Sequence, residues 1–222
     1  MVRKTLLVAL AIGLTVSAAQ AQSSKFEISA TAGWTFSDGV SGAPVVVPGV
    51  GTFDRVDPKD SFSWGLRAGY LLTENHEIGF LFNMQPTELE VSGTTTVSLG
   101  DQSVYNYHGY YAYTFGNIDA PARPYLLVGL GATSFGAVNA TIDDMQQEVG
   151  GGTKFSGTLA LGLKLFPFAS PKFGFRAEAR FTPTYIKSDP GGWWCGYWGC
   201  YLTEDPQYAN QFELLGGIIL RL

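Results

Sequence analysis

Apolar residues recur at every second position along most of the chain beyond residue 24, which is the spacing expected of half-exposed β-strands. In the last segment, for example, the even positions are apolar or glycine, while Glu213 and Arg221 stand at odd positions. We therefore expect an all-β chain of eight strands. Their approximate bounds are residues 25–36, 62–72, 77–84, 103–115, 124–135, 153–166, 172–185 and 211–222.

Pro86 disturbs the alternation after the third of these segments. Apolar residues occupy even positions before it, whereas Leu89 and Val91 are apolar at odd positions. A bulge or a strand end at this proline would account for the change of phase, because proline cannot donate a hydrogen bond to a neighbouring strand.

The connections between the expected strands alternate between short and long. This alternation is typical of up-and-down antiparallel barrels that span bacterial outer membranes. The final strand reaches the last residue, where an unsupported chain would fray, so we expect it to pair with the first strand and close a barrel. Short turns are expected at residues 73–76, 116–123 and 167–171, and long loops at 37–61, 92–102, 136–152 and 186–209.

The first 21 residues have the three parts of a secretory signal peptide. Arg3 and Lys4 provide the charged start, residues 5–16 are mostly apolar, and Ala19-Gln20-Ala21 provides a cleavage site. A membrane-anchoring helix is the alternative, but the apolar run is shorter than the roughly 20 residues that a helix needs to span a bilayer. The expected units are a cleaved signal at residues 1–21 and one barrel domain at residues 22–222.

The net charge argues against one class of partner. Without Arg3 and Lys4, the 14 basic residues of the chain become 12, against 19 acidic residues, so the net charge after cleavage is −7. We expect no nucleic acid partner, because nucleic acids require a basic surface. Most of the acidic residues fall in the long connections. They could bind divalent cations, although a solvated acidic surface is the simpler interpretation.

Lys25 and Lys172 stand at strand ends, where they can reach water, and Lys154 is assigned to the outside. The other charged residues within the strands share one face, with five basic and four acidic side chains. A soluble barrel of the lipocalin type would also alternate, but its apolar face would point inward and its surface charges would need no matching. A closed interior needs nearly balanced charge, because an unpaired buried charge costs on the order of several kcal/mol. We therefore expect a membrane barrel. Its lumen would hold Glu27, Arg67, Glu77, Lys164, Arg176, Glu178, Arg180, Glu213 and Arg221.

The sequence resembles the family of small outer-membrane β-barrels that includes the OmpA transmembrane domain and OmpX- and OmpW-like proteins. The resemblance spans the mature chain and rests on residues 26–36, 123–131 (RPYLLVGLG) and 211–222. Family members commonly end in Phe or Trp, whereas this chain ends in Leu222. The resemblance implies a transmembrane barrel in a Gram-negative-type envelope, in contact with lipid and lipopolysaccharide and inserted by the barrel-assembly machinery.

The lumen charges allow two interpretations. They could line a gated ion path, or they could form a salt-bridged plug. The interior of an eight-stranded barrel is just wide enough for side chains, which favours the plug. We expect His108 in the same interior as a hydrogen-bonded residue.

A second candidate site lies in the last long loop, where three of the five tryptophans and both cysteines fall close together. In an exported protein, Cys195 and Cys200 can form a disulfide that pins a tight loop. The aromatic residues could form an exposed contact site for a surface ligand, or could rest against lipid head groups as part of an interfacial girdle. They are Trp193, Trp194, Tyr197, Trp198 and Tyr201.

Motifs for catalysis and metal binding are missing from the sequence. Lipid A deacylases of similar size carry a His-x-Ser pair, whereas His108 is followed by Gly109-Tyr110 and His76 by Glu77-Ile78. Two cysteines without a nearby histidine are too few for a zinc site. No serine-nucleophile, zinc-protease or phosphate-loop motif is present either. We expect no cofactor, no metal and no enzyme, but a structural role in the envelope or surface interaction through the loops. The alternative is a small pore for ions or apolar compounds.

Overall fold

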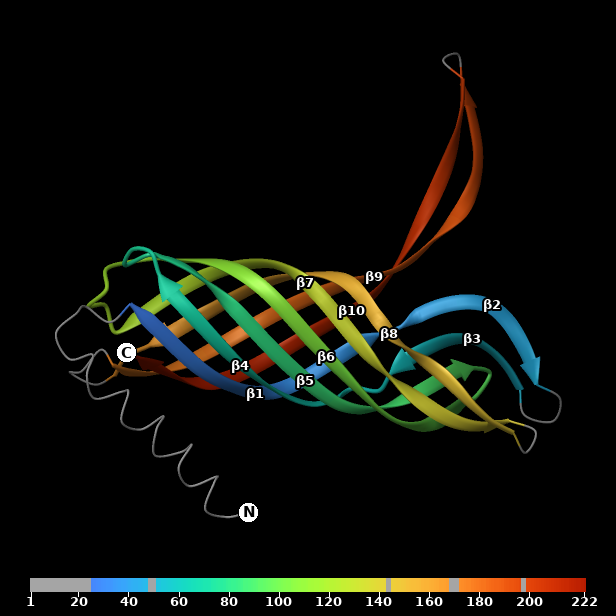
Figure 1. The fold of residues 1–222 in the computed structure, drawn as a ribbon, viewed down its shortest axis with the longest axis horizontal. Helices are drawn as coiled ribbons and strands as arrows, with labels where there is room; N and C mark the ends of the chain where they lie inside the picture. Colours follow the sequence, from blue (N-terminus) through green and yellow to red (C-terminus); the bar gives the residue numbers. More distant parts are fainter. Residues whose placement is uncertain (1–24, 48–50, 143–144, 168–171, 197–198) are drawn as a thin grey trace, which may run out of the picture.

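The structure is a computed structural model that describes residues 25–47, 51–142, 145–167, 172–196 and 199–222, so the expected signal peptide lies outside the described residues. In the described part of the chain, no helix is long and apolar enough to cross a membrane. Ten strands of the described residues form one sheet (Figure 1). They are β1 (Phe26–Asp38), β2 (Val40–Val47), β3 (Gly51–Pro58), β4 (Ser61–Leu71), β5 (His76–Gly93), β6 (Thr96–Thr114), β7 (Ala122–Ile142), β8 (Met145–Leu165), β9 (Phe173–Gly196) and β10 (Gly199–Arg221).

The sheet closes on itself through eight of these strands. β1 pairs with both β10 and β4, and β5 pairs with both β4 and β6, so β1 and β4 to β10 form a closed antiparallel ring. β2 and β3 extend the sheet along β5 without joining the ring. The pairing of β1 with β10 runs from Glu27 opposite Arg221 to Asp38 opposite Asn210. The predicted eight-stranded barrel and its closure by the last strand are therefore confirmed.

The barrel strands point most of their polar residues inward and most of their large apolar residues outward, although a smaller cluster that includes Leu81 and Leu127 is buried inside. In β4, Leu66 is 51% exposed while its neighbour Arg67 is 4% exposed. The pattern follows from the sequence, because successive side chains of a strand point to opposite faces. Large apolar side chains therefore cover the outside of all eight strands. A soluble barrel of the lipocalin type has the opposite arrangement, whereas an apolar outer wall is suited to lipid.

The turn between β4 and β5 and the turn between β6 and β7 lie at one end of the barrel, which we call the short-turn end, together with the C-terminus (Figure 1). Aromatic rings pair on the outer wall near this end. The rings of Phe26 and Tyr70 are 5.2 Å apart, and those of Tyr113 and Phe115 are 4.9 Å apart. Rings at this level are typical of the girdles that barrels place at a membrane–water interface.

The prediction of a bulge or a strand end at Pro86 is wrong. β5 continues through Pro86, which stands opposite Ser103, and the register shift lies later, between Leu89 and Glu90. Pro86 is tolerated because only β6 pairs with β5 at this point: the pairing with β4 ends at Met84 and that with β3 begins at Leu89. A residue with one neighbouring strand does not need to donate to a second. Odd-numbered side chains from Leu81 to Leu89 all point inward, so the apolar residues change face although the strand does not change phase, and Leu89 is buried.

Most of the predicted long loops are β-hairpins. β2 and β3 lie within the first of them, and β5–β6, β7–β8 and β9–β10 continue as paired strands past the barrel. The β9–β10 hairpin is paired as far as Gly196 and Gly199. Figure 1 shows it projecting away from the barrel at the end opposite to the short turns.

Candidate functional site

The barrel interior brings together the nine charged residues that the alternation assigns to the lumen. Each is 4% exposed or less. They come from six strands and point inward because each has the parity of the inner face of its strand. Their ion pairs form two groups along the barrel axis. The short-turn layer contains Glu27, Glu77, Lys164, Arg176 and Arg221, and the middle layer contains Arg67, Glu178, Arg180 and Glu213.

Glu27 is the centre of the short-turn layer. Its carboxylate accepts hydrogen bonds from Lys164 Nζ at 2.6 Å, Arg176 Nη2 at 2.6 Å and Arg221 Nε at 3.1 Å. Lys164 also donates to Glu77 at 2.6 Å. Side chains from β1, β5, β8, β9 and β10 therefore meet in one buried cluster.

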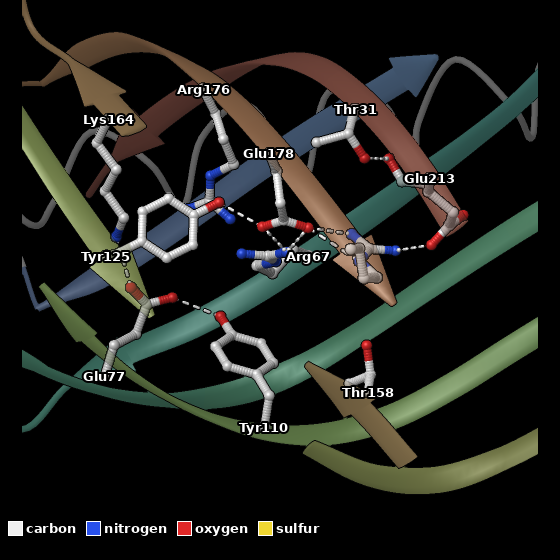
Figure 2. Close-up of polar contacts among 12 residues, drawn as sticks. Thr31, Arg67, Glu77, Tyr110, Tyr125, Thr158, Lys164, Arg176, Glu178 and Glu213 are labelled. Atoms are coloured by element: carbon white, nitrogen blue, oxygen red, sulfur yellow. Dashed lines mark hydrogen bonds and ion pairs between the residues drawn. The ribbon is translucent and has the colours of Figure 1, made fainter. Parts of the chain in front are cut away.

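Glu178 is the centre of the middle layer. Arg67 Nη2 and Arg180 Nη2 each donate to it at 2.7 Å, and Tyr125 donates a third hydrogen bond (Figure 2). Arg180 Nη1 also donates to Glu213 at 3.1 Å. Hydrogen bonds between charged groups are roughly twice as strong as neutral ones, so this layer ties β4, β7, β9 and β10 together across the lumen.

Two tyrosines fill the space between the layers, as Figure 2 shows. Tyr110 donates to Glu77 and lies beneath Arg67, whose guanidinium carbon is 5.1 Å from the ring centre. Tyr125 stacks in the same way with Arg176 at 5.2 Å. Cation–π contacts of this kind favour a charged group that has lost its water. The alternation placed Tyr110 on the inner face, whereas Tyr125 was not among the residues expected there.

Arg123 is the charged interior residue that sequence reasoning missed. It was expected in the turn at residues 116–123, yet it is 1% exposed, and its Nη2 donates to the carbonyl oxygen of Glu74 at 2.7 Å. Arg123 and Tyr125 share the odd parity of the inward residues Leu127 and Thr133 in β7. If the expected strand at residues 124–135 had begun one residue earlier, at Arg123, the same parity would have placed Arg123 inside the barrel.

The described interior beyond the middle layer holds polar, uncharged side chains next to a few apolar ones such as Val104. His108 lies there, with its Nε2 2.9 Å from Ser156 Oγ. Its Nδ1 has no hydrogen-bond partner among the described residues, so the pair lacks the third residue that orients a catalytic histidine. Asn106 donates to Gln211 at 3.0 Å nearby. Within the described ranges, no group of three or more His, Cys, Asp or Glu side chains could hold a metal ion.

The aromatic segment belongs to the projecting β9–β10 hairpin. The strand register places Cys195 opposite Cys200 and Trp194 opposite Tyr201, while Trp193 stands opposite Leu202. Tyr197 and Trp198 lie outside the described residues. The disulfide between the two cysteines and the binding role of the aromatic residues remain predictions.

Comparison with known proteins identifies the family. The sequence profile described as "Outer membrane protein beta-barrel domain" matches residues 6–207. The protein belongs to this outer-membrane β-barrel family. No curated protein sequence matches the chain. The family membership makes the apolar outer wall a lipid-facing surface and the protein a small barrel of the outer membrane.

Solved structures of outer-membrane barrels share the fold. Neisserial surface protein A superposes with a TM-score of 0.51 at 16% identity, over 89% of this chain and 97% of that one. OprG from Pseudomonas aeruginosa superposes with a TM-score of 0.50 at 12% identity, over 88% of this chain and 96% of that one. The protease OmpT from Escherichia coli also matches, with a TM-score of 0.46 at 9% identity, over 91% and 99% of the two chains. These likenesses show the fold alone, and a shared fold does not decide activity.

Proposed function

We propose that the protein is a non-enzymatic outer-membrane barrel with a closed interior, which supports the envelope and presents its long hairpins for surface interaction. The observation that carries this proposal is the pair of charged layers across the lumen. Every charged residue in them is bonded to a partner on another strand. A solute passing through the barrel would have to break these bonds.

The middle layer supports the closed state most directly. Arg180 bridges Glu178 and Glu213, and Arg67 reaches Glu178 from β4 on another side of the ring. These four side chains are 4% exposed or less. Breaking a buried pair by removing one partner costs about 3–5 kcal/mol, so opening the layer would be expensive at ambient temperature.

Export and orientation complete the proposal. The segment at residues 1–21 would act as a cleaved signal peptide. The short turns would face the periplasm and the long hairpins would face the outside, as in other barrels of this kind. The barrel-assembly machinery would insert the chain, and lipid and lipopolysaccharide would surround its outer wall.

The β9–β10 hairpin is the best-placed element for surface contact. It carries Trp193, Trp194 and Tyr201 beyond the barrel, and tryptophan and tyrosine are enriched in binding hot spots. A disulfide between Cys195 and Cys200 would hold the tip in one conformation and reduce the entropy that binding must overcome. The partner would be a surface molecule that accepts aromatic contacts.

Recordings on the purified protein in planar bilayers test the closed interior. We expect no stable single-channel openings from the wild type, and openings in Arg180→Ala, because alanine removes the bridge between Glu178 and Glu213. Arg55→Ala, which changes an exposed ion pair on β3, serves as the matched control and should stay silent. Stable openings of the wild type would overturn the closed state and support the alternative, a small pore for ions or apolar compounds.

A further inference from the structure

The short-turn layer contains more positive than negative charge. With Arg123 included, four cationic side chains face two carboxylates, Glu27 and Glu77. The middle layer is balanced, with two arginines and two glutamates. The cations of the short-turn layer are 3% exposed or less and comprise Arg123, Lys164, Arg176 and Arg221.

Three of these cations stand side by side on neighbouring strands. Arg123 of β7 is directly opposite Lys164 of β8, which is directly opposite Arg176 of β9. Like charges that face each other across strands destabilise a sheet. Arg221 acts on Arg123 as a further like charge. The buried carboxylate of Glu27 acts on Arg123 in the opposite sense, but it is shared with Lys164, Arg176 and Arg221. The carboxylates of Glu74 and Asp119 also act on Arg123, but both residues are exposed in the turns, where water screens them.

The arginines of this layer also hold hydrogen-bond donors that meet no acceptor in the described part of the chain. Each binds the protein through one nitrogen: Arg123 and Arg176 through Nη2, and Arg221 through Nε. Buried donors without an acceptor are rare, because each costs roughly 1–3 kcal/mol or more for a charged group. The buried nitrogens without an acceptor among the described residues are Arg123 Nε, Arg176 Nε and Nη1, and Arg221 Nη1 and Nη2.

We propose that the short-turn layer binds a small inorganic anion, such as a halide, among Arg123, Arg176 and Arg221. Water could accept the free hydrogen bonds but would leave the excess positive charge uncompensated. An anion would accept the free hydrogen bonds and compensate the excess positive charge. It would also screen the cations on β7, β8 and β9 from one another. This binding does not depend on the proposed surface role.

The surroundings fix the donors and define the entrance. The Phe166 ring centre lies 4.0 Å from the guanidinium carbon of Arg221, and Tyr125 lies under Arg176. Arg123 binds the carbonyl oxygens of Glu74 and Gly116 in the short turns, so the layer lies directly behind these turns. In the closed interior proposed above, the middle layer would block the path from the other end. An anion would therefore enter from the short-turn end.

Bromide titration of the purified protein in detergent tests the site, with gluconate keeping the ionic strength constant. The readout is the Nε–Hε signal of each arginine in 15N NMR. We expect the signals of Arg176 and Arg123 to shift and saturate together. The Nε of Arg180 donates to Glu178 in the middle layer, so its signal should stay in place. Arg55, on the exposed β3, should show only the weak, unsaturated shift of a surface charge.

Two results would overturn the proposal. One is a wild-type titration in which the Nε–Hε signals of Arg176 and Arg123 show no saturating shift, or shift no more than the signal of Arg55. The other is an unchanged bromide affinity in Arg221→Gln, which removes two of the free donors and one positive charge. We expect its dissociation constant to rise about tenfold or more, whereas Arg55→Gln should leave it unchanged. If Arg221→Gln does not fold, Arg123→Gln replaces it, and the wild-type titration remains decisive.

Discussion

Glu27 and Arg221 stand opposite each other where the first strand meets the last, 194 positions apart in the sequence, and their side chains are joined at 3.1 Å inside the barrel. Backbone pairing and a buried ion pair thus close the ring at the same place. Glu27 also binds Lys164 and Arg176, so the carboxylate that closes the barrel also organises its charged interior.

Replacing Glu27 with glutamine tests this relationship. The change keeps the size of the side chain but leaves Lys164, Arg176 and Arg221 without their shared counter-charge. We expect Glu27→Gln to lower the free energy of unfolding by about 3–5 kcal/mol. Urea unfolding in lipid vesicles, followed by heat-modifiable migration on gels, measures the loss.

Glu88→Gln is the matched control for this change. Glu88 pairs with Lys59 at 3.6 Å outside the barrel, and both side chains are exposed. Exposed pairs contribute about 0–1 kcal/mol, so this variant should unfold nearly as the wild type does. An equal loss in the two variants would mean that Glu27 is not the buried centre of the layer.

Leu161→Arg tests the lipid-facing wall. Leu161 is 60% exposed on the outside of β8, between Phe155 and Leu165. An arginine on the lipid face near the middle of the bilayer costs about 2–4 kcal/mol. Val56 is 43% exposed on β3, which lies outside the ring, and Val56→Arg should change the unfolding free energy little. Equal unfolding of the two variants in vesicles would contradict the assignment of the outer wall to lipid.

The sequence predicts the barrel well because both faces of each spanning strand are constrained. In β9, lipid requires apolar residues such as Phe175 on one side, and the lumen requires polar partners such as Glu178 on the other. Beyond the membrane neither face of a strand has to meet lipid, so a regular alternation no longer marks it. This explains why β2, β3 and the outer halves of β7 to β10 were expected as loops.

Two features of the charged interior could not be predicted from the sequence, namely the position of Arg123 and the pairing of the charges. The nine charged residues follow from parity alone, but Arg123 lies between Pro121 and Pro124, and prolines suggested a turn. Which charges pair also depends on the stagger of strands around the ring. Lys164 and Glu77 lie on strands that are not neighbours in the sheet, and no periodicity specifies such a contact.

Thiol labelling tests the disulfide predicted for the hairpin tip. Cys195 and Cys200 are opposite each other in the register of β9 and β10, and we expect neither to react with a maleimide until the protein is reduced. The Cys195→Ser/Cys200→Ser double variant should keep the unfolding free energy of the barrel, because the tip lies beyond the ring. Two thiols that react without reduction would show that the disulfide is absent.

Two glycines at the seam between β1 and β10 test the closeness of the strands. A Cβ added to Gly33 would overlap the carbonyl oxygen of Leu214, whereas one added to Gly216 would meet nothing nearby. We expect Gly33→Ala to lower the free energy of unfolding by about 1–3 kcal/mol, since crowding forces backbone shifts. Gly216→Ala should be neutral or slightly stabilising, because alanine restricts the unfolded chain. Both changes add one methyl group at the same seam, so equal unfolding in vesicles would show that β1 and β10 are not packed as tightly as the barrel requires.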